Sequence, residues 1–265
     1  MRFKLTLTVE RVSFGNALPL SYQYELSSFI YHTLANGSAD YAEWLHHNGF
    51  AVEGKQFRLF VFSPLLIPKI SIDKENGRLL LISDYAELLI SFLPERSTEE
   101  FVKGVFCNRQ FTLGDRQSKV QFCITGVEML PPPSFDGEII GNTLSPLCLS
   151  RKNEEGKIHY FSAADPDAGR AIVNNLTNKY EAFYGKPFEG DTAFEWKTLT
   201  EPRSKLITIK AGTPQQTNVK GSLCRFSLKA DNELLKIAYE TGVGEKNSQG
   251  FGMIQTSKVL KTFEV

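Results

Sequence analysis

Three consecutive prolines near the middle of the chain constrain its fold more than any other feature. Pro131-Pro132-Pro133 can continue neither a helix nor a central strand, because proline lacks the backbone N–H and fixes φ. The 265 residues exceed the usual size of a single domain, although one large domain stays open. We therefore expect two domains, residues 1–130 and 131–265, that meet at these prolines.

The first half reads as β, α, several β, α, β. Apolar residues at every second position of Arg2–Glu10 are typical of a half-buried strand. The spacing of Leu26, Phe29, Ile30 and Leu34 predicts a helix ending at Asn36-Gly37, after which Ser38 caps a second, short helix up to Asn48-Gly49. Further elements are expected as strands at Gln56–Ser63, Arg78–Ser83, Glu87–Leu93 and Val120–Met129, and as a helix opened by a capping box of Ser97 and Glu100.

The second half repeats this order of elements. Its expected elements are strands near Ser145–Arg151 and His159–Phe161, a helix Asp165–Tyr184, strands Phe194–Leu199, Leu206–Lys210 and Ser222–Lys229, a helix Asn232–Glu240 and a last strand from Phe251. Order and lengths fit an α+β protein of two tandem ferredoxin-like (βαββαβ) domains with a C-terminal glycine-rich loop.

The charge of the chain is balanced overall but not locally. Thirty basic and thirty acidic residues give zero net charge, which does not by itself indicate nucleic-acid binding. Between Glu201 and Ala230, however, Glu201 is the only acid, and a local positive stripe can bind phosphate. The basic residues of this stretch are Arg203, Lys205, Lys210, Lys220, Arg225 and Lys229.

The most distinctive motif is the glycine-rich loop, Gly242–Gly252. Glycine at positions 242, 244, 250 and 252 allows positive φ and a close approach of the backbone to a ligand, and Lys246 adds charge. A helix C-cap plus a β-bulge would account for one or two of these glycines. Dinucleotide and P-loop motifs are excluded by spacing, since Asn247 stands where a glycine is needed and no G-K-[ST] occurs.

The pattern G-apolar-G, five residues, G-apolar-G after a helix resembles the signature of the repeat-associated RNA-binding superfamily. The segment LLKIAYETGVGEKNSQGFGMI, the opening MRFKLTL, the helix with Tyr31, and Thr143–Leu147 are similar to its CRISPR repeat-processing endoribonucleases. The resemblance implies binding and cleavage of CRISPR repeat RNA, without metal or cofactor, by attack of a 2′-hydroxyl. It also leaves open other subunits of a CRISPR interference complex and a homodimer as partners.

By this resemblance, His46, Tyr31 and Lys55 occupy the family's catalytic positions. His46 would be the general acid or base, Lys55 the charge stabiliser and Tyr31 an orienting or proton-transferring hydroxyl. A histidine in the last turn of a helix feels the negative end of the dipole, which favours the imidazolium. His47 points about 100° further around the helix. The alternatives are a core-edge tyrosine, a solvated helix end and a merely flanking lysine. His32 and His159 are expected to be surface or hydrogen-bonded histidines, although either could contact RNA.

Two rival functions remain. A catalytically inactive RNA-binding subunit of the same superfamily would keep the loop without needing His46, and a ferredoxin-like metabolic enzyme or small-molecule regulator would suit the neutral charge. No apolar run reaches the roughly 18 residues of a membrane span, and the opening alternation is unlike a secretory signal. We expect a cytoplasmic protein without a membrane partner.

Overall fold

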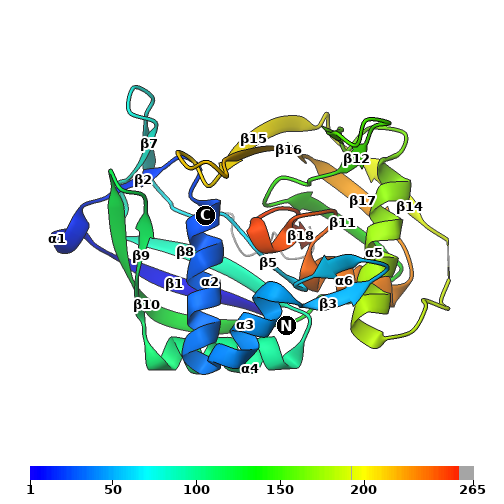
Figure 1. The fold of residues 1–265 in the computed structure, drawn as a ribbon, viewed down its shortest axis with the longest axis horizontal. Coiled ribbons are helices and arrows are strands. Elements are labelled where there is room, and N and C mark those ends of the chain that lie inside the picture. The colour runs from blue at the N-terminus through cyan, green and yellow to red at the C-terminus, as the bar shows by residue number, and fades with distance from the viewer. Residues whose placement is uncertain (192, 257–265) are drawn as a thin grey trace.

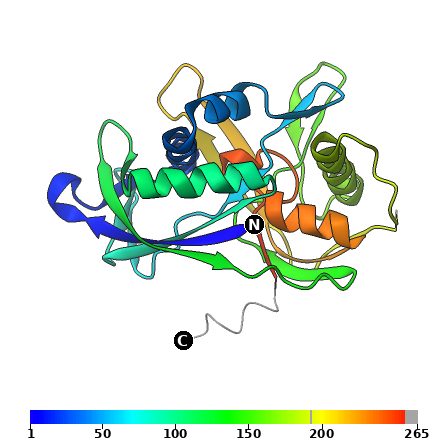
Figure 2. The same ribbon diagram turned by 90° about the horizontal axis from the view of Figure 1, so that it is seen from below.

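The first half of the chain is built on a five-stranded antiparallel sheet. A computed structural model describes residues 1–191 and 193–256 (Figure 1). The sheet order is β5-β8-β1-β10-β9, with α2 and α4 packed against each other over one face (Figures 1 and 2). The elements are β1 (Arg2–Glu10), α1 (Arg11–Phe14), β2 (Ala17–Pro19), α2 (Gln23–Gly37), α3 (Ala39–His47), β3 (Phe50–Val52), β4 (Lys55–Phe57), β5 (Phe60–Phe62), β6 (Ile70–Asp73), β7 (Arg78–Leu81), β8 (Tyr85–Phe92), α4 (Glu95–Cys107), β9 (Gln110–Gly114) and β10 (Lys119–Leu130).

The second half repeats the arrangement with four strands in the order β14-β17-β11-β18. Its elements are β11 (Glu138–Thr143), β12 (Ser150–Lys152), β13 (Ile158–Tyr160), α5 (Ala168–Tyr184), β14 (Glu195–Thr198), β15 (Arg203–Ile209), β16 (Thr217–Leu223), β17 (Arg225–Lys229), α6 (Asn232–Thr241), the 3₁₀ turn η1 (Asn247–Gln249) and β18 (Ile254–Thr256). Numbered within the second half, this sheet has the order 2-3-1-4, and β5-β8-β1-β10 of the first sheet follow the same pattern, with the hairpin strand β9 added beyond β10. The expected pair of tandem ferredoxin-like folds is therefore confirmed.

Each sheet buries its own apolar core beneath its helices. Phe29 and Ile30 of α2 belong to one buried cluster with Phe92 and Phe122 of the first sheet, whereas Ile172 and Leu176 of α5 belong to the cluster that contains Phe226. Leu59 and Leu93 come from the first half but pack in the second core. The two halves therefore share buried surface.

Polar contacts also join the halves. Arg2 of β1 is buried, donates from Nη1 to the carbonyl of Ile254 at 2.8 Å, and lies 3.6 Å over the Tyr239 ring of α6. The N-terminal ammonium donates to Glu240 at 2.9 Å. In the part of the chain that the structure describes, no helix is long and apolar enough to cross a membrane.

Several element boundaries differ from the sequence-based prediction in the first half. The expected strand Gln56–Ser63 is interrupted at Leu59, whose φ is +53°, so that β4 pairs with β3 while β5 joins the main sheet. The capping box is wrong as well. Helix α4 begins after Pro94, and Ser97 lies buried inside it with its Oγ 2.5 Å from the Tyr41 hydroxyl.

Element boundaries differ in the second half as well; α5 starts at Ala168 rather than Asp165, and β15 starts at Arg203 rather than Leu206. The first sheet strand of this half is Glu138–Thr143 rather than Ser145–Arg151, because Pro146 interrupts that run and leaves two isolated bridges. The expected strand Ser222–Lys229 splits at Cys224, where the chain passes from the β15–β16 hairpin into the sheet. The last strand starts at Ile254 and not at Phe251, since Gly252 has a φ of +73°.

Candidate functional site

Helices α2 and α3 bring Tyr31 and His46 into contact. Ser38 stops α2 and starts α3, its hydroxyl accepting from the Tyr41 N–H, so that the two helices pack together. The Tyr31 and His46 rings meet edge to face with centroids 5.0 Å apart. The Phe60 ring of β5 also lies edge to face with the Tyr31 ring, with centroids 5.6 Å apart. Two of the three expected catalytic side chains are therefore adjacent.

Arg58 supplies a cation at this pair. Its Nη2 donates to the carbonyl of His46 at 2.6 Å and its Nη1 to that of Asn48 at 3.2 Å, which satisfies backbone acceptors at the end of α3. Arg58 also interacts with the Tyr31 hydroxyl. Sequence reasoning missed this residue. The available signal was a single charge inside the apolar run Phe57–Phe62.

Two adjoining cavities open around Arg58. One, of about 760 Å³, is lined by Tyr31 and His46 together with Lys210, Lys246 and the exposed His32. The other, of about 580 Å³, is lined by Lys55, Lys152 and the polar face of α5. Both cavities share Gln56, Arg58, Lys246 and Ser248. We refer to them together as the cleft.

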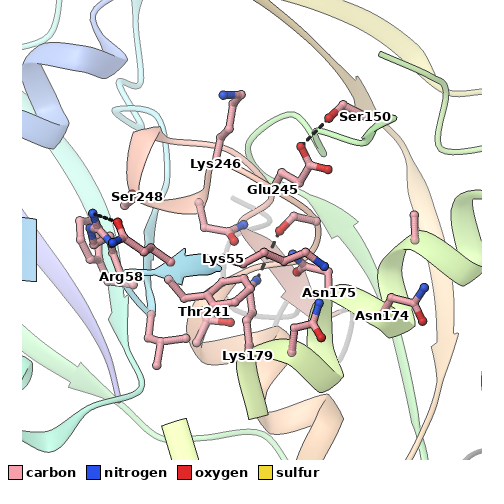
Figure 3. A pocket seen from close by; sticks show the side chains of 18 of the residues that line it. Lys55, Arg58, Ser150, Asn174, Asn175, Lys179, Thr241, Glu245, Lys246 and Ser248 are labelled. Atoms are coloured by element: carbon pink, nitrogen blue, oxygen red, sulfur yellow. Dashed lines mark hydrogen bonds between the residues drawn. The ribbon is translucent and has the colours of Figure 1, made fainter. Parts of the chain in front are cut away.

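Lys55 does not join Tyr31 and His46 in one cavity. It starts β4 and lines the smaller cavity only, where Figure 3 shows it reaching toward Asn175 on the α5 wall. His47 stacks edge to face on His46 at 4.8 Å but lines neither cavity. His159 lies exposed in β13, as expected for a surface histidine.

The surroundings lower the pKa of His46 below its ordinary value of 6.5. Partial burial is the main cause, and the positive charges of His47, Arg58 and Lys210 add to it. The net shift is therefore opposite to the stabilisation of the imidazolium that we expected from the helix dipole. Burial raises the pKa of Tyr31, partly offset by Arg58 and Ser248. Near neutral pH the cavity thus holds a neutral imidazole beside a protonated phenol.

The glycine-rich loop is buried between the two halves. Gly252 has a φ of +73°, and a Cβ on it would lie 2.0 Å from the Val243 carbonyl oxygen. A Cβ on Gly244 would lie 2.5 Å from the Cys148 carbonyl oxygen. Gly242 and Gly250 are buried too and have positive φ. Internal packing thus accounts for all four glycines, and the close approach of this backbone to phosphate stays a prediction.

The side chains of this loop, by contrast, reach the cleft. Lys246 and Ser248 line both cavities, and the Ser248 carbonyl accepts from the Ser27 hydroxyl of α2 at 2.7 Å. Lys179 of α5 holds the loop from the other side. Its Nζ is buried and donates to the Gly242 carbonyl at 2.7 Å, and burial lowers its pKa to about 7.

The basic residues from Arg203 to Lys229 do not form one stripe. Lys205 pairs with Gly221 and Leu206 with Lys220, so Lys205 and Lys220 lie on opposite faces of the β15–β16 hairpin. Lys229 lies in the sheet and forms an ion pair with Glu195 at 3.0 Å. Exposed Arg203 and Arg225 line neither cavity; of the six residues, only Lys210 lines the cleft.

Two tandem ferredoxin-like halves with a cleft between them are the architecture expected of a protein of the repeat-associated RNA-binding superfamily. Models of the N-terminal and C-terminal parts of CRISPR-associated protein Cas6 match residues 17–127 and 130–256. The CRISPR-associated endoribonuclease Cas6 1 of Methanocaldococcus jannaschii is 32% identical over 273 residues, which cover 99% of this chain and 98% of that relative. The chain therefore belongs to the Cas6 family.

Other relatives support this assignment. The CRISPR-associated endoribonuclease Cas6 of Pyrococcus furiosus is 28% identical over 257 residues, 96% of this chain and 89% of the relative. A solved structure of a CRISPR associated protein Cas6 superposes with a TM-score of 0.74 at 31% identity, covering 97% and 98% of the two chains. The product of a Cas6-related gene from Pyrococcus furiosus shares the fold, with a TM-score of 0.82 at 23% identity over 98% and 99%.

Proposed function

We propose that this chain is a metal-independent endoribonuclease that binds CRISPR repeat RNA and cleaves precursor transcripts into guide RNAs. The observation that carries the proposal is the edge-to-face contact of Tyr31 and His46 beside Arg58. The endoribonuclease names of the two curated relatives support the same activity.

The reaction we propose is an internal transesterification. Neutral His46 accepts the proton of the 2′-hydroxyl on the 5′ side of the scissile phosphate, and the oxygen attacks phosphorus. A 2′,3′-cyclic phosphate forms while the P–O5′ bond breaks, and the leaving oxygen takes a proton to become a 5′-hydroxyl. Burial raises the pKa of Tyr31, so its phenol carries a proton near neutral pH, and we assign it as the donor to the leaving oxygen.

Arg58 is the cation we assign to the charge that develops on the phosphate. It lines the His46 cavity, whereas Lys55 lines the neighbouring one. Lys55, Lys210 and Lys246 then serve the flanking phosphates along the cleft. This keeps the expected role of Lys246 and Lys210 in RNA binding but moves Lys55 away from the reacting phosphate.

Cleavage of repeat RNA in excess EDTA tests the proposal. The expected products end in a 2′,3′-cyclic phosphate and a 5′-hydroxyl, and a single 2′-deoxy nucleotide 5′ of the cut blocks cleavage while the RNA stays bound. Cleavage of the deoxy substrate would overturn the mechanism. Tight binding without any product would instead indicate a catalytically inactive RNA-binding subunit.

A further inference from the structure

The smaller cavity of the cleft has a wall of amide side chains that the cleavage reaction does not use. Asn174, Asn175 and Asn178 of α5 line it together with Lys55 of β4, and Figure 3 shows Asn175 close to Lys55. Among the described residues, the Oδ1 atom of Asn175 is buried and has no hydrogen-bond partner. A buried acceptor without a partner is costly and needs a donor from elsewhere.

The missing donor restricts the chemistry of the ligand. A phosphodiester carries only acceptor oxygens, so it cannot satisfy Oδ1 of Asn175. The edge of a nucleobase offers N–H donors next to acceptors, which an asparagine amide matches with two hydrogen bonds. A ribose 2′-hydroxyl is the other donor that an RNA strand carries.

The rest of the cavity suits a base and its backbone. Phe57 and Ile158 provide apolar surface against which the face of a base can pack, and Ile158 is 56% exposed in the absence of a ligand. The same cavity is also lined by three positively charged side chains, those of Lys55, Lys152 and Lys246. The volume of about 580 Å³ lies within the range of small-ligand sites.

We propose that this cavity takes one unstacked base of the bound RNA, whose edge is read by the amides of Asn175 and Asn178 while Lys55 and Lys152 hold its phosphates. The inference rests on the function proposed above and adds sequence recognition to it. Because the two cavities share Arg58 and Lys246, the base that is read lies close in sequence to the scissile phosphate.

Abasic scanning tests this inference. The probe is a set of single-stranded RNAs of one CRISPR repeat from the same genome, 2′-deoxy at the cut and each lacking one base. With the parent protein, removing the base that occupies the cavity weakens binding by about 5- to 150-fold. With Asn178→Ala, affinity for the complete repeat falls, and that abasic penalty shrinks or disappears. Asn36→Ala, at an exposed asparagine of α2 outside the cleft, keeps the full penalty.

A second variant separates recognition from folding. Asn175→Leu keeps the shape of the side chain and removes the unpaired acceptor, so the free protein remains at least as stable while the abasic penalty is lost. A purely structural role would instead lower the stability of the free protein. The inference fails if the Asn178→Ala and Asn175→Leu proteins show the parent's penalty at every position, or if one 2′-deoxy substitution alone reproduces the loss. If the parent protein neither binds nor cleaves the repeat, the proposed function fails with it.

Discussion

His46 and His47 are adjacent in sequence but differ in their surroundings. His46 meets Tyr31 and lines the cleft, whereas His47 touches His46 from outside it. The two histidines lie in the same helix and differ in orientation, so His47 is a matched control for His46.

Replacing His46 by alanine is expected to slow single-turnover cleavage by about 100- to 10,000-fold while repeat affinity changes only a few-fold. The reason is that an acid–base residue acts on the transition state more than on ground-state binding. The matched variant His47→Ala keeps most of the activity. Equal losses in the two variants would show that the assignment to His46 is mistaken.

The lowered pKa of His46 also predicts a pH profile. A base must be deprotonated, so kcat/KM rises with pH through a midpoint below 6.5 and then levels off. Arg58→Gln removes one of the charges that depress the pKa, and its residual activity should titrate at a higher midpoint. A parental midpoint above 6.5, or a rate that falls as pH increases from 5 to 7, contradicts a neutral His46 base.

At the scale of elements, the glycine-rich loop packs tightly between β5 and the segment that connects β11 to β12. Gly250 packs against Phe62 and Gln23, and Gly244 packs against Leu147 and Cys148. Its glycines serve folding, and the side chains between them serve the cleft.

Gly252→Ala is expected to destabilise the protein in the absence of RNA. Gly156 offers a matched control, because its φ of +75° is nearly the same but a Cβ there has nothing within 4 Å. Beyond the backbone cost common to both variants, Gly252→Ala should lose about 1–3 kcal/mol of unfolding free energy from overpacking. Chemical denaturation of both variants measures the difference. Equal unfolding free energies of the two variants would show that the loop accommodates the extra methyl group and is not tightly packed.

Sequence patterns predicted those elements whose bounds are set by a local signal, such as apolar alternation or a helix cap. The alternation in Arg2–Glu10 gave the bounds of β1, and Ser38 began α3. Sequence patterns failed where tertiary contacts split an expected strand into two. Phe60–Phe62 is fully buried in the main sheet, whereas Lys55–Phe57 pairs only with β3. Glycines 242 to 252 were recognised as a unit, but their partners, such as Cys148, lie far away in sequence and could not be read from spacing.

At the scale of the whole molecule, RNA is expected to follow the cleft rather than a basic stripe. Lys210→Ala and Lys246→Ala should each lower the slope of log affinity against log salt by about 0.7, the value for one single-strand phosphate contact. Lys229→Ala should leave the slope unchanged, because Lys229 lies outside the cleft and is paired with Glu195. Binding titrations from low to high salt measure all three slopes. A reduced slope for Lys229→Ala alone would point to the hairpin and sheet side of the second half.

Only part of the candidate site could be predicted from the sequence, because folding brings together residues from separate segments to form the cleft. Tyr31 and His46 were identified through resemblance, and their contact depends on how α3 folds back on α2. Arg58 gained its role only from hydrogen bonds to the end of α3. The low pKa of His46 arises from charges brought together by folding, which a helix-dipole argument on an isolated segment does not include.

The cleft is assembled from segments that lie far apart in the sequence. Tyr31 and His46 leave the ribosome well before Lys246 and Ser248, and before Gly250, which packs against Phe62. Domains generally begin to fold as they emerge, N-terminal part first. A nascent first half would nevertheless lack one wall of its cleavage cavity. Chains terminated before Lys246 should consequently lack cleavage activity, so activity is expected only after the segment that contains Lys246 and Ser248 has been translated.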